Sequence, residues 1–345
     1  MNLRMILRNG LCLIALLWTD FPGWVSPAVA AAPPFWGFAL DGYPVTAGRL
    51  ADLEAKAGLQ AQVVVFFLQW PAPGEAGSFP AESLEAIWSR GAVPCLTWEP
   101  MYYREGREVA IPAEEILGGR YDDHLHAFAE SARRWGRPLL IRFAHEMNLK
   151  RYHWGTDREA YGPRSPELYR RMFRYVTELF RRDKAGNVRW VFCPNAESVP
   201  DRSHDPEAAW NCPEAYYPGD DAVDVLGMDG YNWGSTKTKE KDGWESRQQS
   251  FREIFSTLYR RLRRLAPTKP ILVFETASVN VGGDRTMWLR EALTAAAEWD
   301  LSGICWFQAE KETDWRIDAG RDADAVGMIR RETSAAQRWI RGWKK

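Results

Sequence analysis

Cysteine and histidine are both scarce in this chain, with five residues of each among 345. No Cys-x-x-Cys pair occurs, which speaks against a structural zinc site, and we expect neither a metal ion nor a cofactor. Cys95, Cys193 and Cys305 lie in apolar runs, where a thiol behaves as a small buried hydrophobe, whereas Cys212 lies in a predicted loop. A Cys193–Cys212 disulfide is conceivable in an oxidising compartment, but spacing does not select it among the possible pairings.

Net charge is also nearly absent, at −1 at pH 7. A balanced charge argues against a polyanionic partner such as nucleic acid. No run of residues is apolar over the length that a bilayer-spanning helix needs. The start of the chain is typical of an export signal: Arg4 and Arg8 precede the apolar run 11–18, and Ala28-Val29-Ala30 offers a cleavage site. We therefore predict a signal peptide at residues 1–30 and an exported, periplasmic or extracellular protein; a retained N-terminal anchor is the alternative.

Eight short apolar, β-rich runs alternate with amphipathic segments along the rest of the chain. Several runs are almost continuously apolar, as expected for strands buried on both faces of a parallel sheet. Strands that alternate with helices, several of them closed by glycine, indicate repeated βα units. Residues 31–345 are therefore predicted to form one α/β domain, a (β/α)8 TIM barrel. The predicted strands are 35–40, 62–69, 92–98, 138–145, 188–194, 223–231, 270–276 and 303–308.

An open doubly wound sheet is the alternative fold, but no Gly-x-Gly-x-x-Gly sequence follows the first strand. Long connections follow the fourth and sixth strands, at 147–165 and 232–245. In a barrel they lie at the carboxyl ends of the strands, where active sites are built. The predicted helices are 50–58, 81–90, 121–135, 166–182, 247–265 and 285–299, with a last helix and a frayed tail at 338–345.

Two of the apolar strands end in glutamate. The fourth ends in Arg142, His145, Glu146 and Asn148, and the seventh ends in Glu275. A buried carboxylate is costly unless it is paired or neutralised, so two such residues are candidates for acid/base chemistry. The fourth and seventh strands face each other across a barrel, where two carboxyl groups can stand about 5–5.5 Å apart, as in a retaining glycosidase. The structural alternative is that each glutamate only pairs with a neighbouring arginine.

The chain resembles glycoside hydrolase family 26 over residues 36–318. The resemblance implies a barrel with the acid/base on strand four and the nucleophile on strand seven, here Glu146 and Glu275. It rests on Arg142–Asn148 with Tyr152 and Trp154, Pro194-Asn195, Tyr216–Asp220, Gly227–Asn232, Glu275-Thr276, Trp306-Phe307 and Asp314–Arg316.

The resemblance also implies roles for neighbouring residues. His145 would position the site and the sugar, and Tyr231 would hydrogen-bond the nucleophile. Arg142 would add positive charge beneath the carboxylates, although a purely structural Arg142 is an equal alternative. Asn148, which ends the same segment, is also a candidate substrate-binding residue.

Tryptophan is abundant, with 18 residues. Pyranose rings pack their C–H faces on indole while their hydroxyls need polar neighbours. Trp306 is the predicted floor of the sugar at the cleavage point, and Trp154 is predicted beside it. Trp98 and Trp233 are further rim candidates, whereas Trp36 and Trp70 fit the core equally well. We expect at least half of the tryptophans to fill the core.

The third strand departs from the mannan-cleaving pattern of the family, because mannanases tend to carry a histidine near here and this chain has Glu99. Glu99 is a candidate third carboxylate that binds sugar hydroxyls. The predicted activity is an endo-acting retaining hydrolase of a β-linked polysaccharide, with β-1,4-mannan or glucomannan favoured. A β-1,3-1,4-glucan or an exopolysaccharide is the alternative substrate.

Other functions fit less well. A His-Glu-x-x-His protease motif is excluded because position 149 is leucine. Asp220, Asp221 and Asp224 are more typical of a solvated turn than of a calcium site. A carbohydrate-binding protein without turnover would need neither glutamate, so an enzyme is favoured. We expect a monomer whose partner is a polysaccharide.

Overall fold

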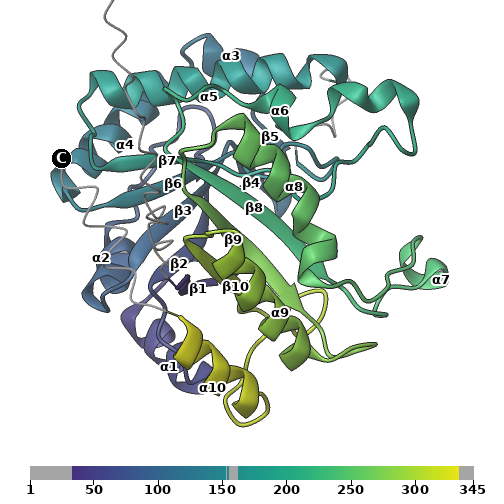
Figure 1. Ribbon diagram of the computed structural model, residues 1–345. Helices are drawn as coiled ribbons and strands as arrows, with labels where there is room; N and C mark the ends of the chain where they lie inside the picture. The colour runs from purple at the N-terminus through teal and green to yellow at the C-terminus, as the bar shows by residue number, and fades with distance from the viewer. Residues whose placement is uncertain (1–32, 153, 155–161, 334–345) are drawn as a thin grey trace, which may run out of the picture. The chain divides into compact units, whose positions relative to one another are not determined.

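The computed structural model describes residues 33–152, 154 and 162–333. The predicted signal peptide and the predicted tail helix at 338–345 lie outside the described residues. Eight parallel strands close into a barrel in the order β1-β10-β9-β8-β7-β6-β3-β2, so the predicted TIM barrel is confirmed (Figure 1). The barrel strands are β1 (Phe35–Ala39), β2 (Val63–Gln69), β3 (Val93–Glu99), β6 (Leu139–Phe143), β7 (Val188–Phe192), β8 (Val225–Asn232), β9 (Ile271–Ser278) and β10 (Gly303–Phe307).

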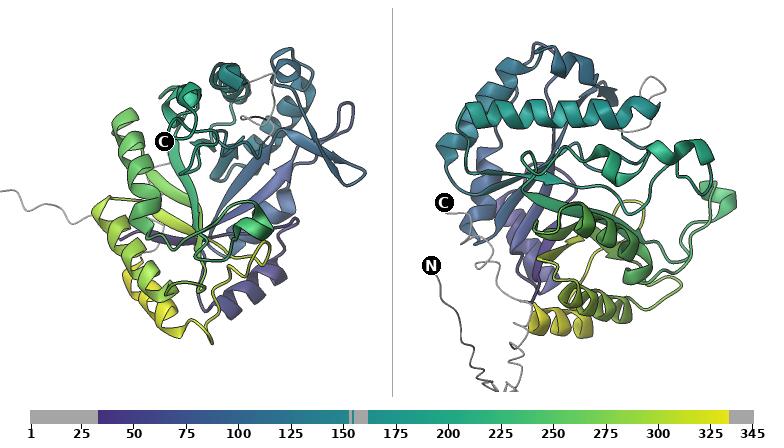
Figure 2. Two further views of the ribbon diagram at one scale, coloured as in Figure 1. Left: turned by 90° about the vertical axis from the view of Figure 1, so that its right-hand side faces the viewer. Right: turned by 45° about the horizontal axis from the view of Figure 1, so that its top comes forward.

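Helices lie around the outside of these strands, as Figure 2 shows. Many have clear start and stop residues. Helix α8 begins with a capping box between Ser250 and Glu253, and α1 ends at Gly58 in a left-handed conformation with φ 65°. The helices are α1 (Ala47–Ala57), α2 (Ala81–Ser89), α3 (Ala113–Leu117), α4 (Asp122–Trp135), α5 (Ser165–Arg182), α6 (Pro213–Tyr216), α7 (Lys239–Asp242), α8 (Phe251–Leu265), α9 (Arg285–Glu298) and α10 (Ala323–Glu332), with short 3-10 turns η1 (Gly162–Arg164) and η2 (Pro206–Trp210). None of the helices in the described ranges is long and apolar enough to cross a membrane.

An antiparallel hairpin follows β3 and was not predicted. It consists of β4 (Met101–Arg104) and β5 (Arg107–Ala110). Glu105 and Gly106 join the strands, and both have positive φ, 51° and 73°. Two residues with φ > 0 form the tight turn whose twist matches a hairpin. The sequence signal was therefore the Glu-Gly pair between two short polar strands. These strands lack the nearly continuous apolar runs from which the barrel strands were predicted.

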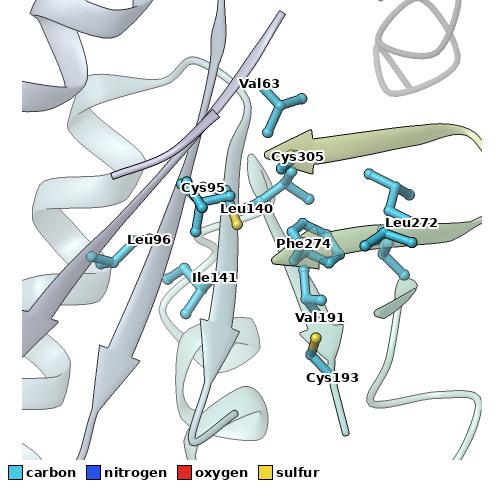
Figure 3. Close-up of a cluster of buried hydrophobic side chains, with 14 of the residues drawn as sticks. Val63, Cys95, Leu96, Leu140, Ile141, Val191, Cys193, Leu272, Phe274 and Cys305 are labelled. Atoms are coloured by element: carbon cyan, nitrogen blue, oxygen red, sulfur yellow. The ribbon is translucent and has the colours of Figure 1, made fainter. Parts of the chain in front are cut away.

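The barrel interior is filled by apolar side chains and thiols (Figure 3). Cys95, Cys193 and Cys305 are buried there, and with Cys212 they are all free. The Cys193–Cys212 disulfide that the sequence left open is therefore not formed. Burial raises the pKa of the Cys193 and Cys305 thiols well above the ordinary value, so both stay protonated.

Gly227 of β8 lies at a tightly packed point of this interior. A methyl group at its Cα would lie 2.5 Å from the Cys193 sulfur and 2.8 Å from the Phe274 ring. We predict that Gly227→Ala lowers the free energy of unfolding by about 1–3 kcal/mol, because overpacking forces its neighbours to move. Urea denaturation measures this change. Gly48→Ala in α1, where nothing lies within 4 Å, is the control and should be neutral or stabilising by up to about 1 kcal/mol. Equal stability of Gly227→Ala and wild type would contradict the packing argument.

Candidate active site

The guanidinium of Arg142, on β6, lies at the centre of the barrel mouth and is fully buried. It donates to Oδ2 of Asp229 at 2.5 Å, to Oε1 of Glu275, and to Oγ1 of Thr97 at 2.6 and 2.9 Å. Burial alone would lower the pKa of Arg142, but Asp229 and Glu275 raise it well above the ordinary value. A buried charge of this kind is stable only with such partners. Arg142 therefore supports the carboxylates from below and is not exposed to a substrate.

Glu275 faces the barrel mouth because of a bulge in β9. Val273 pairs with Met228 and Glu275 pairs with Asp229, so Phe274 is the extra residue on β9. Phe274 packs against Gly227 in the interior, and the next residue, Glu275, also points inward to Arg142. Regular alternation would send one of these two side chains outward. The bulge thus lets β9 supply both a core aromatic ring and the carboxylate.

Tyr231 of β8 provides a second donor to Glu275, with its hydroxyl 2.8 Å from Oε2. Burial and then the neighbouring Glu275 raise the pKa of Tyr231 well above 10, so the phenol keeps its proton. Each oxygen of Glu275 thus accepts a hydrogen bond, one from Arg142 and one from Tyr231. Hydrogen bonds to the ionised form favour a carboxylate.

Glu146 occupies a sharp turn immediately beyond β6. Ala144 and Glu146 both have positive φ, 48° and 50°, which is uncommon for residues with a side chain. The backbone N–H of Glu146 donates to the Cys193 carbonyl at 2.8 Å. Its Oε1 accepts from Nδ2 of Asn195 at 2.6 Å, and Tyr152 also acts on this carboxyl group. The turn therefore ties the β6 end to β7 and fixes the carboxyl group.

The two glutamates differ in their electrostatic surroundings. Burial, and next the charge of Glu275, raise the pKa of Glu146 to about 7, although Asn195, Arg142 and Tyr152 oppose the rise. Arg142 contacts Glu275 directly but acts on Glu146 only through space. The arrangement therefore keeps a proton on Glu146 near neutral pH while Glu275 is held by two donors.

His145 precedes Glu146 in the sequence, and its ring lies close to Glu275. Its Nε2 is 3.1 Å from the Tyr152 hydroxyl and 3.9 Å from Oε1 of Glu275. Burial and the charge of Arg142 lower the pKa of His145 well below 6.5, so the ring is neutral. The predicted place of His145 in the site agrees with this geometry.

Glu99 ends β3 and points into the same mouth. It is 5% exposed, and its Oε2 accepts from Nε2 of Gln69 at 2.5 Å. Burial raises the pKa of Glu99 to about 7, against the hydrogen bond from Gln69 and the charge of Arg142. Arg142 and Glu275 both act on it electrostatically, which places it near the other carboxyl groups.

Trp98 and Trp306 are not brought to the site, and their assignment as sugar-contacting residues is corrected. Both are fully buried. Trp98 packs on Phe128 of α4, and Trp306 packs on Trp36 and on Trp288 of α9. Successive residues of a strand point to opposite faces, so with Thr97 and Glu99 facing the mouth, Trp98 faces the helices. Trp306, on β10, also faces the surrounding helices.

The two remaining tryptophan candidates occupy different positions. Trp154 is 4% exposed, stacks on Tyr152 at 4.8 Å and donates from Nε1 to the His145 carbonyl at 2.7 Å. It therefore holds the segment that follows Glu146 against the His145 backbone. Trp233 is partly exposed beyond β8 and lies 4.8 Å from Trp315, which in turn lies 5.2 Å from Tyr231. Trp233 thus remains the tryptophan candidate for a sugar contact. Trp36 and Trp70 are core residues.

Asn148 is also corrected, from a substrate-binding candidate to a loop anchor. It is fully buried. Its Nδ2 donates to the carbonyls of Asn195 and Glu197 at 2.9 and 2.6 Å, and its Oδ1 accepts from the Asn195 backbone N–H at 2.9 Å. These bonds hold the segment from which Asn195 reaches Glu146.

Sequence reasoning assigned no site role to Asp229, Asn195, Tyr152 or Trp315. Asp229 was detectable as an acidic residue inside an otherwise apolar strand, since a buried acid requires a partner. The contacts of Asn195 and Tyr152 depend on loop geometry, and Trp315 follows a β10 loop without periodic pattern. In the described ranges, no cluster of His, Cys, Asp and Glu has the arrangement of a metal site.

The chain is similar in sequence to known glycoside hydrolases. The sequence model of glycosyl hydrolase family 26 matches residues 119–245. Endoglucanase H of Acetivibrio thermocellus is 30% identical over 281 residues, which cover 80% of this chain and 28% of that protein. A mannan endo-1,4-beta-mannosidase of Bacillus subtilis is 33% identical over 171 residues, 43% of each chain. The chain thus spans well under two thirds of the curated relatives it matches.

Solved structures share the fold. The Bacillus subtilis mannanase man26 superimposes with a TM-score of 0.60 at 14% identity, over 88% of this chain and 87% of the other. A family 26 β-mannanase from Bacteroides ovatus gives a TM-score of 0.59 at 18% identity, over 88% and 89%. At these identities the likeness supports the barrel alone.

Because the pKa of Glu146 is raised, we predict that the free energy of unfolding falls as pH rises. A carboxyl group whose pKa is higher in the folded protein than in the unfolded chain binds more protons when folded, so stability falls as pH rises from about 4.5 to 7. Glu146→Gln mimics the neutral form. We expect it to raise the free energy of unfolding by about 1–3 kcal/mol at pH 8 and to change it little at pH 4. Urea denaturation at both pH values measures this, and a variant less stable than wild type at pH 8 would contradict the electrostatic assignment.

Proposed function

We propose that this chain, whose residues 119–245 match the sequence model of glycosyl hydrolase family 26, is a member of that family and a retaining β-glycoside hydrolase, with Glu146 as acid/base and Glu275 as nucleophile. The observation that carries the proposal is the unequal setting of the two glutamates. Arg142 and Tyr231 both donate to Glu275, whereas Glu146 is buried beside that charge with a pKa raised to about 7. A carboxyl group that keeps its proton near neutral pH suits the acid, and a carboxylate held by two donors suits the nucleophile.

The reaction would proceed in two displacements. In the first, a Glu275 oxygen attacks the anomeric carbon, the glycosidic C–O bond breaks, and Glu146 transfers its proton to the leaving oxygen. In the second, the Glu146 carboxylate removes a proton from water, the water oxygen attacks the anomeric carbon, and the ester to Glu275 breaks. Arg142 and Tyr231 would stabilise Glu275 as its charge returns.

The proposed substrate is a β-linked polysaccharide cleaved within the chain, with β-1,4-mannan or glucomannan favoured. Mannan endo-1,4-beta-mannosidases among the relatives support this choice. The second candidate is a β-1,3-1,4-glucan or another glucan, because the relative that covers 80% of this chain is named an endoglucanase. Glu99, at the mouth in place of the expected histidine, also favours a substrate other than plain mannan.

We expect Glu275→Ala to lower hydrolysis by about 10⁴-fold or more, because it removes the group that forms the intermediate. Glu146→Gln should lose about 10²–10⁴-fold on polysaccharide and much less on an aryl glycoside, whose leaving group needs no proton. The measurement is reducing-end release from mannan, glucomannan, lichenan and β-1,3-xylan. Substrate binding by wild type without any release of reducing ends would instead indicate a carbohydrate-binding protein.

The stereochemistry of the same digests tests the nucleophile. Proton NMR of the first product should show the β-anomer, since two inversions restore the configuration. An initial α-anomer would leave Glu275 as a general base and exclude the covalent step.

We also propose that the protein acts after export, as a monomer, with residues 1–30 removed as a signal peptide. The apolar run and the small residues at 28–30 support this proposal. Expression in a secreting bacterial host should give an exported protein whose N-terminus, by Edman sequencing, is Ala31. A retained residue 1 on membrane-bound protein would support the anchor instead.

A further inference from the structure

Among the described residues, an ion pair joins the β4–β5 hairpin to the segment that follows Glu146. Arg151 donates from its two terminal nitrogens to both carboxylate oxygens of Glu108, at 2.9 and 2.8 Å. Glu108 belongs to β5 and Arg151 follows β6, so the pair joins segments 43 residues apart. The base of the hairpin is fixed separately, because the Trp70 backbone N–H donates to the Glu99 and Met101 carbonyls, both at 3.0 Å.

Arg151 contacts Tyr152 as well as Glu108. Its guanidinium lies 5.1 Å from the centre of the Tyr152 ring, within the range of a cation–π contact. Tyr152 also stacks on Trp154 at 4.8 Å with an interplanar angle of 16°. Bidentate arginine–carboxylate pairs have fixed geometry, so Glu108 restricts where Arg151 can place its guanidinium against Tyr152.

Tyr152 contacts the reacting end of the site. Its hydroxyl is 3.1 Å from Nε2 of His145, and Tyr152 is near enough to Glu146 for the two groups to influence each other's pKa. A series of interactions therefore runs from Glu108 through Arg151 and Tyr152 to Glu146. Glu108 is at the end of this series that is farther from the two catalytic candidates.

We propose that Glu108 is a positioning residue for the acid/base, which acts by holding Tyr152 against Glu146 through Arg151. The inference rests on the proposed role of Glu146 as acid/base. It assigns a function to the hairpin that carries Glu108.

Tyr152 lowers the pKa of Glu146, so loosening its position should raise that pKa. The charged and titratable groups around Glu146 include Glu275 of β9, Arg142 of β6, Asp229 and Tyr231 of β8, and Tyr152. His145 contacts Tyr152, and Arg151 acts on His145 and on Glu99. An effect of Glu108→Gln on the titration of Glu146 that passes through Tyr152 is therefore recognised by its loss when Tyr152 is replaced.

The experiment is a double-mutant cycle of Glu108→Gln and Tyr152→Phe on the full chain. Carboxyl titration by ¹³C NMR of glutamate-labelled protein reads the pKa of Glu146, and the pH profile of kcat/KM on the best substrate reads its basic limb. We expect Glu108→Gln to move both upward by at least 0.3 of a pH unit, about twofold in the ionisation constant. In the Tyr152→Phe background the same substitution should have no further effect.

The matched control is Asp221→Asn. It weakens the bidentate pair with Arg174, at 2.8 Å for both contacts, which joins α5 to the segment before β8. This variant should leave the titration of Glu146 unchanged. An unshifted Glu146 in Glu108→Gln, an equal shift in the Tyr152→Phe background, or the same shift in Asp221→Asn would each overturn the inference. Because the NMR titration needs no substrate, it decides the matter even for a chain that cleaves none of the polysaccharides.

Discussion

The site depends on the buried guanidinium of Arg142. A positive charge without water is stable only when the surrounding residues neutralise it, and Arg142 meets this condition with Asp229 and Glu275 and with the hydroxyl of Thr97. These partners come from β8, β9 and β3, so one side chain connects four barrel strands. Asp229 also pairs with Arg142. Glu275 can therefore lose its charge to an ester without leaving Arg142 unpaired.

The backbone around this charge departs from regular geometry at the two catalytic candidates. A bulge at Phe274 turns Glu275 toward the mouth, and positive φ at Ala144 and Glu146 turns the other carboxyl group inward. Such conformations persist only where surrounding contacts hold them. At Glu146 these contacts are the Cys193 carbonyl and the Asn195 side chain. The rigid barrel supplies both, which is why strained residues can occur at its rim.

The sequence predicted the barrel because buried parallel strands leave nearly continuous apolar runs, and the eight predicted strands overlap the observed ones. It predicted Glu146 and Glu275 because a carboxylate at the end of such a run stands out. It failed for Trp98 and Trp306, since apolar runs buried on both faces carry no alternation to show which side faces the mouth. Asn148 failed for another reason: a polar residue beside a catalytic motif can serve the loop instead of the substrate.

Protonation of acidic side chains reduces the negative charge at the barrel mouth. Arg142 acts on four carboxyl groups, those of Asp229, Glu275, Glu146 and Glu99, while His145 is held neutral. One buried cation offsets only part of four acids, so burial and mutual repulsion raise the pKa of Glu146 and of Glu99 to about 7. The mouth therefore gains negative charge as pH rises through neutrality, which disfavours a polyanionic chain there. An uncharged polysaccharide meets no such repulsion, and a protonated Glu99 could donate a hydrogen bond to one of its hydroxyl groups.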